Sequence, residues 1–591
     1  MSNEPSAADF AGLPRVWRPR ASPTGDHVVF FWNPGSHYEL FIYDTDTEEQ
    51  WQVTDGGLHR SPNAPVVWAP SGQTLFIQTG EHGYDLETIF RVDIDGGLDT
   101  VAEPGGGWGM LWGVDPTETW LLCTQASDGK TQRLYRYEIE MGERTQLSGP
   151  GTEVPARGAR IAPDGDLICY SGNATSNPGN SDAYVVDPDD PSPRRLSVDG
   201  ADSVRTQGWH PDGRHVLLYD EDADRTGEYN LDTEETRWFG SGTPLTYLDG
   251  ATILANSPDR VYERATDEAT VLDISGRLGD ELVAGEVCLD SNRLLVTRET
   301  ERRPQELYVY DRQTSEGTRV VTTDFGPLDP ESFVTAEDVT YESVDGRVVE
   351  GLLYRPDTAS DETPVPVVVE AHGFPAEAGR GFQPKVQFLV SKGYAVLKPN
   401  FRGENDRDEG FAASIQGDWG GAEQADVAAA ASWLAEQDWA SADRLAIYGH
   451  SFGGFTAYTQ LVRYPETWTV GIASGGMTDL HSLDAAKGGN ELLRDQLGHP
   501  RENAALWCDR SPITHVADIE RPLFILHGGA DPTAPVSQAW AFKGALESVR
   551  EWTEGEDFEY TEIDEGEHGN LDHETRARQW ELVVDFLNRR L

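Results

Sequence analysis

One serine in the chain has neighbours that would make it a nucleophile. Residues 447–454 (IYGHSFGG) predict a strand that runs into a sharp turn with Ser451 at its tip, and residues 455–463 predict a helix that follows at once. Small residues on both sides of a serine tolerate the strained backbone of such a turn. The helix N-terminus would favour negative charge that develops beside the hydroxyl. An ordinary Gly-rich loop has the same local spacing, so the prediction depends on the flanking strand and helix.

A serine hydroxyl becomes a good nucleophile when a base removes its proton and a carboxylate orients that base. In an α/β-hydrolase the partners follow the serine in the order Asp, His, each on a loop after a later strand. Residues 522–526 predict a short strand followed by Asp531, and residues 558–563 predict a strand that leads to His568. We therefore predict a triad of Ser451, Asp531 and His568. An Asx turn and a surface histidine are the structural alternatives for the last two residues.

Three other histidines lie close to these positions in the sequence. His450 adjoins the nucleophile and is expected to pack beside the turn, and His527 is expected to bond backbone in its own loop. His573 precedes the final helix and is the one rival to His568 as the base.

A tetrahedral oxyanion needs two backbone N–H donors. One is predicted from Phe452, the residue after the nucleophile. The other is expected from the loop after the strand of residues 365–371, where Phe374 is the first choice and Gly373 the second.

Two further features adjoin the predicted site. Arg402 is predicted either to bind substrate or to form a structural ion pair among the many acids. Gly373 is also predicted to bind substrate, from its own loop. Residues 477–507 are predicted either to cap the pocket or to pack in the core. Their large apolar side chains are Leu483, Leu492 and Trp507.

Seven motifs occur in a fixed order between residues 372 and 569. They are HGFP (372–375), KGYAVL (392–397), NFRG (400–403), DWGG (418–421), GHSFGG (449–454), HGGAD (527–531) and HG (568–569). In these motifs the chain resembles the prolyl oligopeptidase family of serine peptidases, in particular its acylaminoacyl-peptidase and dipeptidyl-peptidase-like branch. The resemblance implies cleavage of short peptides from the N-terminal side, with a propeller that limits access. The chain departs from the family pattern at Phe374, where a second glycine is usual, and at residues 404–409, so its specificity stays open.

The first 325 residues predict short strands, many turns and hardly any amphipathic helix. A corner of the form x-Pro-x-Gly, or a close variant, recurs at Pro23, Pro70, Pro116, Pro163 and Pro211, with spacings of 47, 46, 47 and 48 residues. A period in the forties with four strands per repeat indicates β-propeller blades, whereas an irregular β-sandwich would not keep a constant period. Weaker corners at 248–250 and 289–291 bring the count to seven blades.

The chain is therefore predicted to contain two domains. A seven-bladed β-propeller is expected over residues 1–325, and an α/β hydrolase with a doubly wound, mostly parallel sheet over residues 326–591. The hinge is expected within residues 322–336, and the polar first dozen residues are expected to pack loosely against the hydrolase.

The composition is strongly acidic. Asp and Glu number 102 against 47 Lys and Arg, which gives a net charge of −55, and six of the bases are lysines. Such a charge destabilises a compact fold at low salt, whereas at molar salt the Debye length falls to about 3 Å. The composition therefore predicts a protein from a halophile with a salt-filled cytoplasm.

The same charge disfavours nucleic-acid binding. The N-terminus lacks the features of a signal peptide, and no apolar run is long enough to span a bilayer, so we expect a cytoplasmic protein without a membrane partner. Cysteines 123, 169, 288 and 508 have no metal-binding or disulfide spacing, and no metal or organic cofactor is expected. The oligomeric state stays open, with a homo-oligomer among the alternatives.

The sequence favours a serine exopeptidase or oligopeptidase that acts through an acyl-enzyme on short peptides. A carboxylesterase or acyl hydrolase is the main alternative, because ester and amide hydrolysis use the same triad. A non-catalytic scaffold is the third hypothesis, and the complete set of predicted catalytic residues disfavours it.

Overall fold

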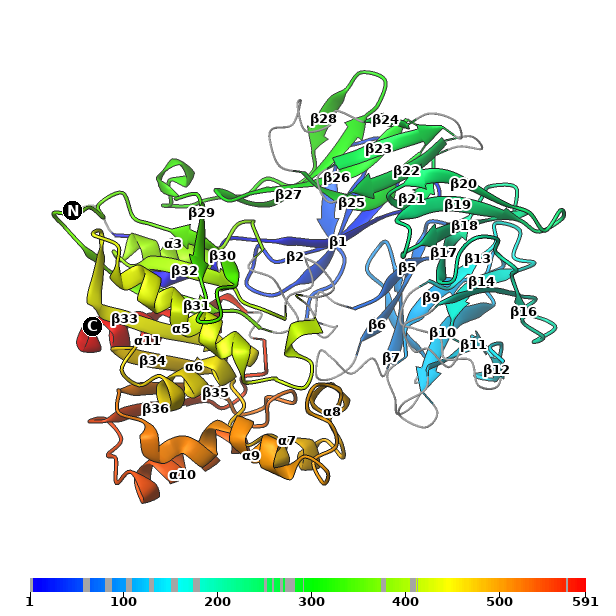
Figure 1. Cartoon of the computed structure of the whole chain (residues 1–591). Helices are drawn as coiled ribbons and strands as arrows, with labels where there is room; N and C mark the ends of the chain where they lie inside the picture. Colours follow the sequence, from blue (N-terminus) through cyan, green and yellow to red (C-terminus); the bar gives the residue numbers. More distant parts are fainter. Residues whose placement is uncertain are drawn as a thin grey trace. The chain divides into compact units, whose positions relative to one another are not determined.

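The computed structural model describes two compact units of the chain (Figure 1). One unit comprises Pro14–Thr300 and Gln305–Thr323, and the other comprises Met1–Leu13, Glu301–Pro304 and Asp324–Leu591. The described residues are 4–591 except 57–63, 80–87, 103–108, 127–131, 150–157, 174–180, 249–251, 258–259, 266–268, 272–281, 291, 374–378, 404–410, 412 and 570–571.

The first unit contains seven four-stranded sheets in its described part, each built from four consecutive strands. This arrangement confirms the predicted seven-bladed β-propeller. Blades one to three contain β1 (Val16–Ala21), β2 (His27–Trp32), β3 (Glu39–Asp44), β4 (Gln50–Gln52); β5 (Val66–Trp68), β6 (Thr74–Thr79), β7 (Thr88–Asp93), β8 (Leu98–Ala102); β9 (Leu111–Val114), β10 (Trp120–Ala126), β11 (Gln132–Glu138) and β12 (Arg144–Gln146).

Blades four and five contain β13 (Arg160–Ile161), β14 (Ile168–Gly172), β15 (Asp182–Val186), β16 (Arg194–Arg195); β17 (Val204–Trp209), β18 (His215–Asp220), β19 (Arg225–Asn230) and β20 (Thr236–Ser241). Blades six and seven contain β21 (Thr243–Tyr247), β22 (Thr252–Ser257), β23 (Arg260–Ala265), β24 (Ala269–Val271); β25 (Leu282–Cys288), β26 (Arg293–Thr300), β27 (Arg303–Asp311) and β28 (Glu316–Arg319).

The predicted proline corners connect the first and second strands of blades one to five. Gly25, Gly72, Gly165 and Gly213 lie in these corners with φ between +68° and +84°, a region that favours glycine. Each corner also packs on the corner of the blade before it. A Cβ added at Gly72 would lie 2.9 Å from Oγ1 of Thr24, for example.

The corner of blade three lacks the glycine. Glu118 occupies the equivalent position with φ +58°, and its Oε1 accepts a hydrogen bond from the N–H of Ser71 in the preceding corner at 2.9 Å. This bond offsets part of the cost of a left-handed non-glycine residue.

Blades one and seven are joined by side-chain packing. A buried apolar cluster contains residues of both blades, among them Val28 and Phe30 of β2 and Leu295 of β26. The corner of blade one also contacts the start of β26: the Arg293 guanidinium donates to the carbonyl oxygen of Gly25 at 3.2 Å. The propeller ring therefore closes through side-chain packing between blades one and seven, and each of these blades takes its four strands from its own stretch of the chain.

The hydrolase unit contains an eight-stranded sheet in the order β29-β30-β32-β31-β33-β34-β35-β36. β29 and β30 pair antiparallel and β30 pairs antiparallel with β32, whereas all later pairs are parallel. The strands are β29 (Glu337–Glu342), β30 (Val348–Tyr354), β31 (Val365–Ala371), β32 (Ala395–Asn400), β33 (Ala440–His450), β34 (Val470–Ser474), β35 (Leu523–Gly528) and β36 (Phe558–Ile563). This is the predicted doubly wound sheet.

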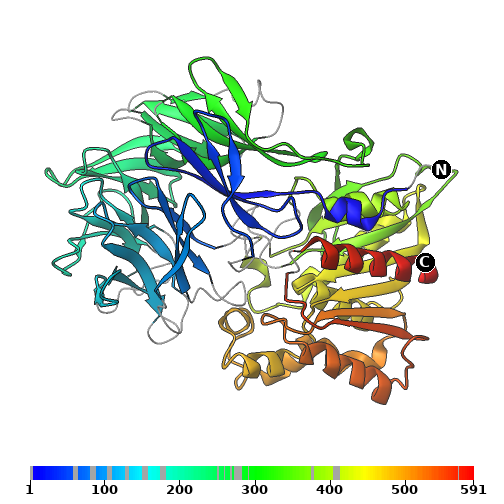
Figure 2. The same ribbon diagram turned by 180° about the vertical axis from the view of Figure 1, so that it is seen from behind.

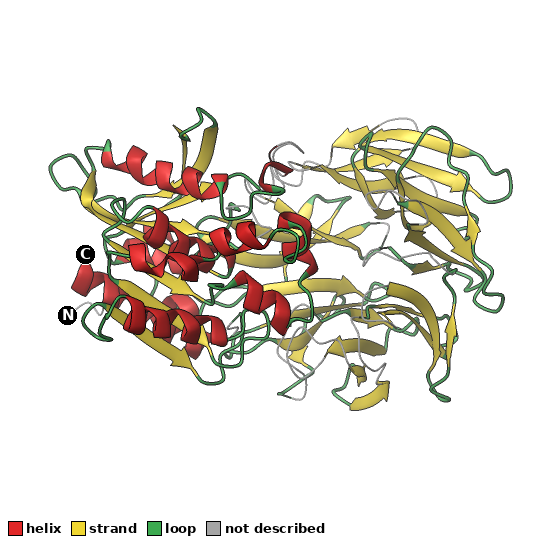
Figure 3. Ribbon diagram, turned by 60° about the horizontal axis from the view of Figure 1, so that its bottom comes forward, coloured by secondary structure: helices red, strands yellow, loops and turns green. Residues whose placement is uncertain are grey.

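Helices cover both faces of the sheet (Figures 2 and 3). One buried cluster includes residues of α5, α6 and α10, and a second includes residues of α1, α3 and α11. The helices are α1 (Ala7–Ala11), α3 (Pro384–Ser391), α5 (Ala422–Ala435), α6 (Phe452–Arg463), α7 (Leu480–Ala486), α8 (Glu491–Leu497), α9 (Ala504–Arg510), α10 (Ser537–Val549) and α11 (His573–Arg590), with 3-10 turns at Pro330–Ser332, Ala413–Ile415 and Pro512–Asp518.

The predicted division between residues 325 and 326 lies close to the observed one. The domain bounds placed residues 1–13 with the propeller, whereas they cluster with the hydrolase, against which the first dozen residues were expected to pack. Ser6 and Asp9 form a capping box that starts α1. α1 buries Phe10 against Phe333 and Phe388, with ring centroids 5.9 and 5.7 Å away. The segment is therefore part of the hydrolase core despite its polar composition.

Candidate active site

The predicted nucleophile lies at the junction of β33 and α6. Ser451 has φ +60° and ψ −118° and immediately precedes the first residue of α6. Its N–H donates to the carbonyl oxygen of Ser474 at 3.0 Å. A non-glycine residue with positive φ is strained, and the surrounding structure must maintain that strain.

Glycines around Ser451 are required by close contacts. A Cβ added at Gly449 would lie 2.2 Å from the backbone of Gly453, and one added at Gly453 would lie 2.0 Å from the carbonyl oxygen of Ala371. A Cβ at Gly454 would lie 2.5 Å from the carbonyl oxygen of Ser474. Helix α6 can therefore approach β31 and β34 only because these positions lack side chains.

Ser451, His568 and Asp531 form a continuous hydrogen-bonded row. Nε2 of His568 lies 2.8 Å from Oγ of Ser451, and Nδ1 of His568 lies 2.7 Å from Oδ2 of Asp531. The other oxygen of Asp531 accepts hydrogen bonds at 2.8 Å from the N–H groups of Thr533 and Ala534. The loop after β35 thus fixes the carboxylate, and the loop after β36 brings the imidazole to it.

Asp531 is 5% exposed. Burial alone would raise the pKa of this carboxyl, but the hydrogen bond and the charge of His568 outweigh burial, and the pKa lies below its ordinary value. Asp531 therefore stays ionised beside the imidazole, which allows it to stabilise a protonated His568.

The other histidines have separate positions. His527 is bonded to the carbonyl oxygen of Ala534 through Nε2 at 2.7 Å, within its own loop as expected. His573 is the first residue of α11, and it is His568 whose ring meets Ser451. His450 lies against His568, with ring centroids 4.9 Å apart.

The predicted oxyanion donors are only partly described. Phe452 is the first residue of α6, so its N–H lies at the N-terminus of that helix, next to Ser451. Gly373 adjoins the nucleophile, since a Cβ added there would lie 4.0 Å from Cβ of Ser451. Phe374 lies outside the described residues.

No sequence pattern marked the buried glutamate that supports this region. Glu423, in the first turn of α5, is fully buried and accepts hydrogen bonds from the N–H groups of Gly420 and Gly421. Burial raises its pKa to about 7. The loop that it holds carries Trp419, whose ring meets the Phe452 ring edge-on at 4.7 Å.

Arg402 has the second of its two predicted roles. Its guanidinium donates to both oxygens of the buried Asp426, at 2.8 and 2.6 Å, and to both oxygens of Asp345, at 3.0 and 3.2 Å. The hydrogen bonds of Asp426 and Asp345 raise the pKa of Arg402 further. An arginine engaged by two carboxylates serves as a structural ion pair, and the structure does not support it as a substrate ligand.

Residues 477–507 contribute to the core at two of the three named side chains. Leu483 and Trp507 are buried in the apolar cluster on the α6 face, whereas Leu492 is 45% exposed. Packing in the core is therefore the observed role of the first two.

Two groups of residues outside this site are candidates for ligand binding. His210, Asp212 and His215 in blade five could hold a metal ion. However, Nε2 of His215 faces the amide nitrogen of Asn230 at 2.8 Å, and Nδ1 of His215 lies 2.8 Å from Asp212. The amide oxygen of Asn230 is committed to two backbone N–H groups, so the proton of His215 is held on Nδ1, where a metal would have to bind.

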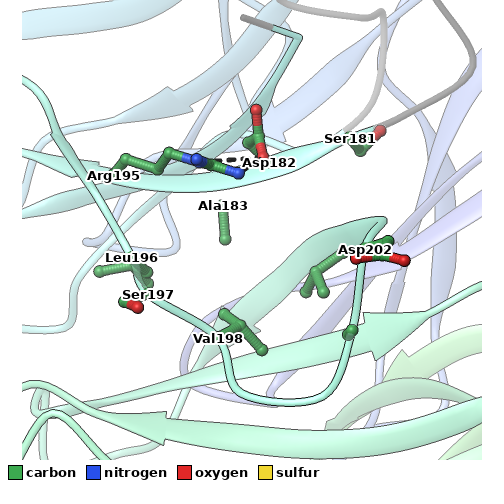
Figure 4. A pocket seen from close by; sticks show the side chains of 10 residues that line it. Ser181, Asp182, Ala183, Arg195, Leu196, Ser197, Val198 and Asp202 are labelled. Carbon is green, nitrogen blue, oxygen red and sulfur yellow. Dashed lines mark hydrogen bonds and ion pairs between the residues drawn. The ribbon is translucent and has the colours of Figure 1, made fainter. Parts of the chain in front are cut away.

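The second group lines a cavity of about 200 Å³ in blades four and five (Figure 4). Two of its three charged side chains, Arg195 and Asp182, are bonded to each other, with Nε of Arg195 donating to Oδ1 of Asp182 at 3.0 Å. Neither group shares a residue with the row at Ser451. Helices in the described part of the chain include none that is both long and apolar enough to cross a membrane.

Comparisons with known proteins show which families and proteins the chain resembles. Residues 380–591 match the model of the prolyl oligopeptidase family, and residues 296–421 match that of acetyl xylan esterase. Dipeptidyl aminopeptidase BIII of Pseudoxanthomonas mexicana is 27% identical over 88% of this chain and 80% of its own length. The acylamino-acid-releasing enzyme of Rattus norvegicus is 28% identical over 36% of this chain and 30% of its own length.

Solved structures show the same fold over the whole chain. A puromycin-hydrolysing peptidase of Mycobacterium tuberculosis superposes with a TM-score of 0.81 at 17% identity, covering 100% of this chain and 97% of that one. At this level of identity the likeness establishes the architecture of a propeller and an α/β hydrolase.

Proposed function

We propose that the chain is a serine peptidase of the prolyl oligopeptidase type that releases residues from the N-terminal side of short peptides, with Ser451 as its nucleophile, since residues 380–591 match that family and a dipeptidyl aminopeptidase is similar over most of the chain. The observation that carries this proposal is the row Ser451–His568–Asp531, with contacts of 2.8 and 2.7 Å. A base within hydrogen-bond reach of a serine, itself oriented by a carboxylate, is the arrangement that acyl transfer requires.

In the proposed mechanism, Oγ of Ser451 attacks the scissile carbonyl carbon while Nε2 of His568 takes the serine proton. The N–H of Phe452 and an N–H of the loop at Gly373–Phe374 stabilise the oxyanion. His568 then donates its proton to the leaving amine, and the C–N bond breaks to leave an acyl-enzyme. Water gives a proton to His568 and attacks the ester, and the returned proton restores Ser451 as the acid product leaves.

The relatives support an exopeptidase and leave the N-terminus of the substrate open. One relative is named for dipeptidyl aminopeptidase activity and another for release of acylated amino acids. Hydrolysis of aminoacyl and dipeptidyl p-nitroanilides, each with a free and an acetylated N-terminus, separates these classes. Ser451→Ala is the control, and a fluorophosphonate probe should label the wild type and not this variant. Absence of wild-type labelling would favour the non-catalytic scaffold.

An esterase is the second candidate function, and the match of residues 296–421 to acetyl xylan esterase favours it. A p-nitrophenyl acetate assay beside the anilides distinguishes the two. Peptidase activity predicts turnover of both substrate types, whereas turnover of the ester alone would replace the peptidase proposal.

We also propose that the protein works in a salt-rich cytoplasm, without a nucleic-acid partner. The support is the net charge of −55 and the use of lysine. Each described lysine is buried or bonded: Lys385 to Glu370, Lys392 to the carbonyl oxygen of Pro5, Lys487 to that of Pro532, Lys543 to Glu554, and Lys398 is buried. The acids therefore dominate the surface charge, and unfolding on transfer from molar KCl to dilute buffer is the expected result. A melting temperature independent of salt would oppose this setting.

A further inference from the structure

His450 is the last residue of β33 and immediately precedes the nucleophile. Its ring lies against the ring of His568, with centroids 4.9 Å apart and planes inclined by 42°. The proposed mechanism uses His568 twice, as base and as acid, and gives His450 no role. The contact therefore needs its own explanation.

Hydrogen bonds fix His450 from two sides. Its Nδ1 lies 3.2 Å from Oγ of Ser474, and a hydrogen bond also links its side chain to the backbone of His568. The carbonyl oxygen of Ser474 accepts the N–H of Ser451 at 3.0 Å. Ser474 therefore holds the nucleophile through its backbone and His450 through its side chain.

One side of this imidazole is closely packed. A Cβ added at Gly475 would lie 3.0 Å from Cε1 of His450 and 3.5 Å from Oδ2 of Asp531. Gly475 takes φ +53°, so the chain turns there without a side chain between the two groups. His450 thus lies close to His568, Ser474 and the region of Asp531 at once.

The environment keeps His450 uncharged. Burial, His568 and Lys385 lower its pKa to about 3, and these effects outweigh Asp531 and the hydrogen bond to the His568 backbone, which raise it. Lys385 is itself paired with Glu370 at 2.8 Å and lies over the Tyr448 ring at 4.4 Å. A neutral imidazole accepts at one nitrogen and donates at the other, which matches one partner on each side.

We propose that His450 is a positioning residue that holds the His568 loop so that one imidazole reaches both Ser451 and Asp531. The inference rests on the proposed function of that row. Because His450 is neutral, it holds His568 without opposing the positive charge that His568 acquires during acyl transfer. Its effect should appear in kcat, since a displaced base slows proton transfer while the substrate still binds.

Three variants test this role in molar KCl with the best anilide substrate. His450→Phe keeps an aromatic ring but removes both hydrogen bonds, and kcat should fall about 10- to 100-fold with KM within about twofold. Ser474→Ala removes one hydrogen bond and leaves the backbone contact to Ser451, so a smaller fall of about 3- to 10-fold is expected. His450→Gln can donate and accept at a similar reach and should recover most of the kcat lost in His450→Phe.

His573→Phe is the matched control, because it changes a histidine at the start of α11 that has no part in the row, and its kcat should equal that of the wild type. Melting temperatures of all variants separate positioning from stability. The proposal is overturned if His450→Phe retains wild-type kcat, or if the Gln and Phe variants lose kcat equally. A wild type that neither hydrolyses anilides nor reacts with the fluorophosphonate probe would instead remove the proposed function itself.

Discussion

Glycine serves the tight turns of both units, but for different physical reasons. In the propeller corners Gly25, Gly72, Gly165 and Gly213 have positive φ, so all four share a conformational requirement, to which Gly25 adds a close contact of its Cβ position with the carbonyl oxygen of Leu289 at 2.5 Å. At the nucleophile turn the three glycines beside Ser451 lie outside the positive-φ region, and each would place a Cβ within 2.5 Å of backbone atoms. The requirement there is space.

The difference explains which turns tolerate another residue. A left-handed backbone costs a non-glycine residue roughly 1–2 kcal/mol, and a single hydrogen bond offsets part of that cost, as Glu118 shows in blade three. A Cβ 2.0 Å from a carbonyl oxygen cannot be accommodated without moving the backbone. In the hydrolase that movement would displace the strained residue, Ser451, which adjoins the glycines.

The largest effect is expected at Gly453. The substitution Gly453→Ala would force α6 away from the carbonyl oxygen of Ala371 and move Ser451 from Nε2 of His568. A shift of about 1 Å in a catalytic group costs on the order of 100-fold, so kcat/KM should fall at least that far. Anilide hydrolysis and the rate of fluorophosphonate labelling measure the loss.

Gly544→Ala is the control for this variant. Gly544 lies in α10 with open space where its Cβ would be, so alanine should leave activity unchanged and stabilise the helix by about 0.5–1 kcal/mol. Wild-type activity in Gly453→Ala would show that steric contact does not define the nucleophile turn.

The sequence was sufficient to place the residues that chemistry restricts most. β31 and β36 have the predicted bounds, and the structure brings together Ser451, Asp531 and His568. Parallel strands direct their carboxyl ends to one edge of the sheet, so loop residues after different strands converge there whatever their distance in the chain. The propeller corners were equally predictable, because their period depends on local turn residues.

Properties set by packing between distant segments were beyond reach of the sequence. Nothing near Arg402 in the chain marks Asp345 and Asp426 as its partners, which lie 57 and 24 residues away. The burial of Glu423 depends on the fold around it. Likewise, the polar composition of residues 1–13 concealed that their few apolar side chains, Phe10 and Leu13 among them, are buried in the core of the hydrolase.

The next largest effect is expected on the free energy of unfolding, when alanine replaces glycine at two different propeller corners. Alanine at Gly25 would add left-handed strain to a Cβ 2.5 Å from the carbonyl oxygen of Leu289, and we expect a loss of about 3 kcal/mol. Alanine at Gly213 would meet only the movable Asp164 side chain at 3.2 Å and should cost about 1 kcal/mol. Urea unfolding in molar KCl measures both. Equal losses would mean that conformation alone sets the requirement at the corners.

The two units also differ in the pKa of a buried carboxyl group at a turn. Burial would raise the pKa of Asp115 in the corner of blade three, but hydrogen bonds from Thr117, Trp120 and Thr119 outweigh it and lower the pKa. Asp115 therefore stabilises the native state above its unfolded pKa, and that contribution is lost as the pH falls through the lowered value. Glu423 has the opposite shift, from 4.5 to about 7.

Between pH 4.5 and 7 the native state holds a proton on Glu423 that the unfolded chain has released, so stability should fall as the pH rises through this range. Glu423→Gln removes that dependence while keeping an acceptor for the N–H groups of the loop. The stability of the variant relative to the wild type should therefore improve by roughly 2–3 kcal/mol from pH 4.5 to pH 8. Calorimetry at both pH values tests this shift. If the stability difference between variant and wild type is the same at both pH values, Glu423 does not titrate between them.

The smallest effect isolates conformational strain in a propeller corner. Glu118→Ala and Glu118→Gly both remove the hydrogen bond to Ser71, but only alanine keeps a side chain at φ +58°. The glycine variant should therefore be about 1 kcal/mol more stable than the alanine variant, although alanine is the better residue wherever φ is negative. Urea unfolding of the pair measures the difference, and kcat should be the same in both. If alanine proves as stable as glycine, the corner of blade three relaxes to another backbone conformation, and the contrast with the sterically closed turn at Ser451 becomes larger.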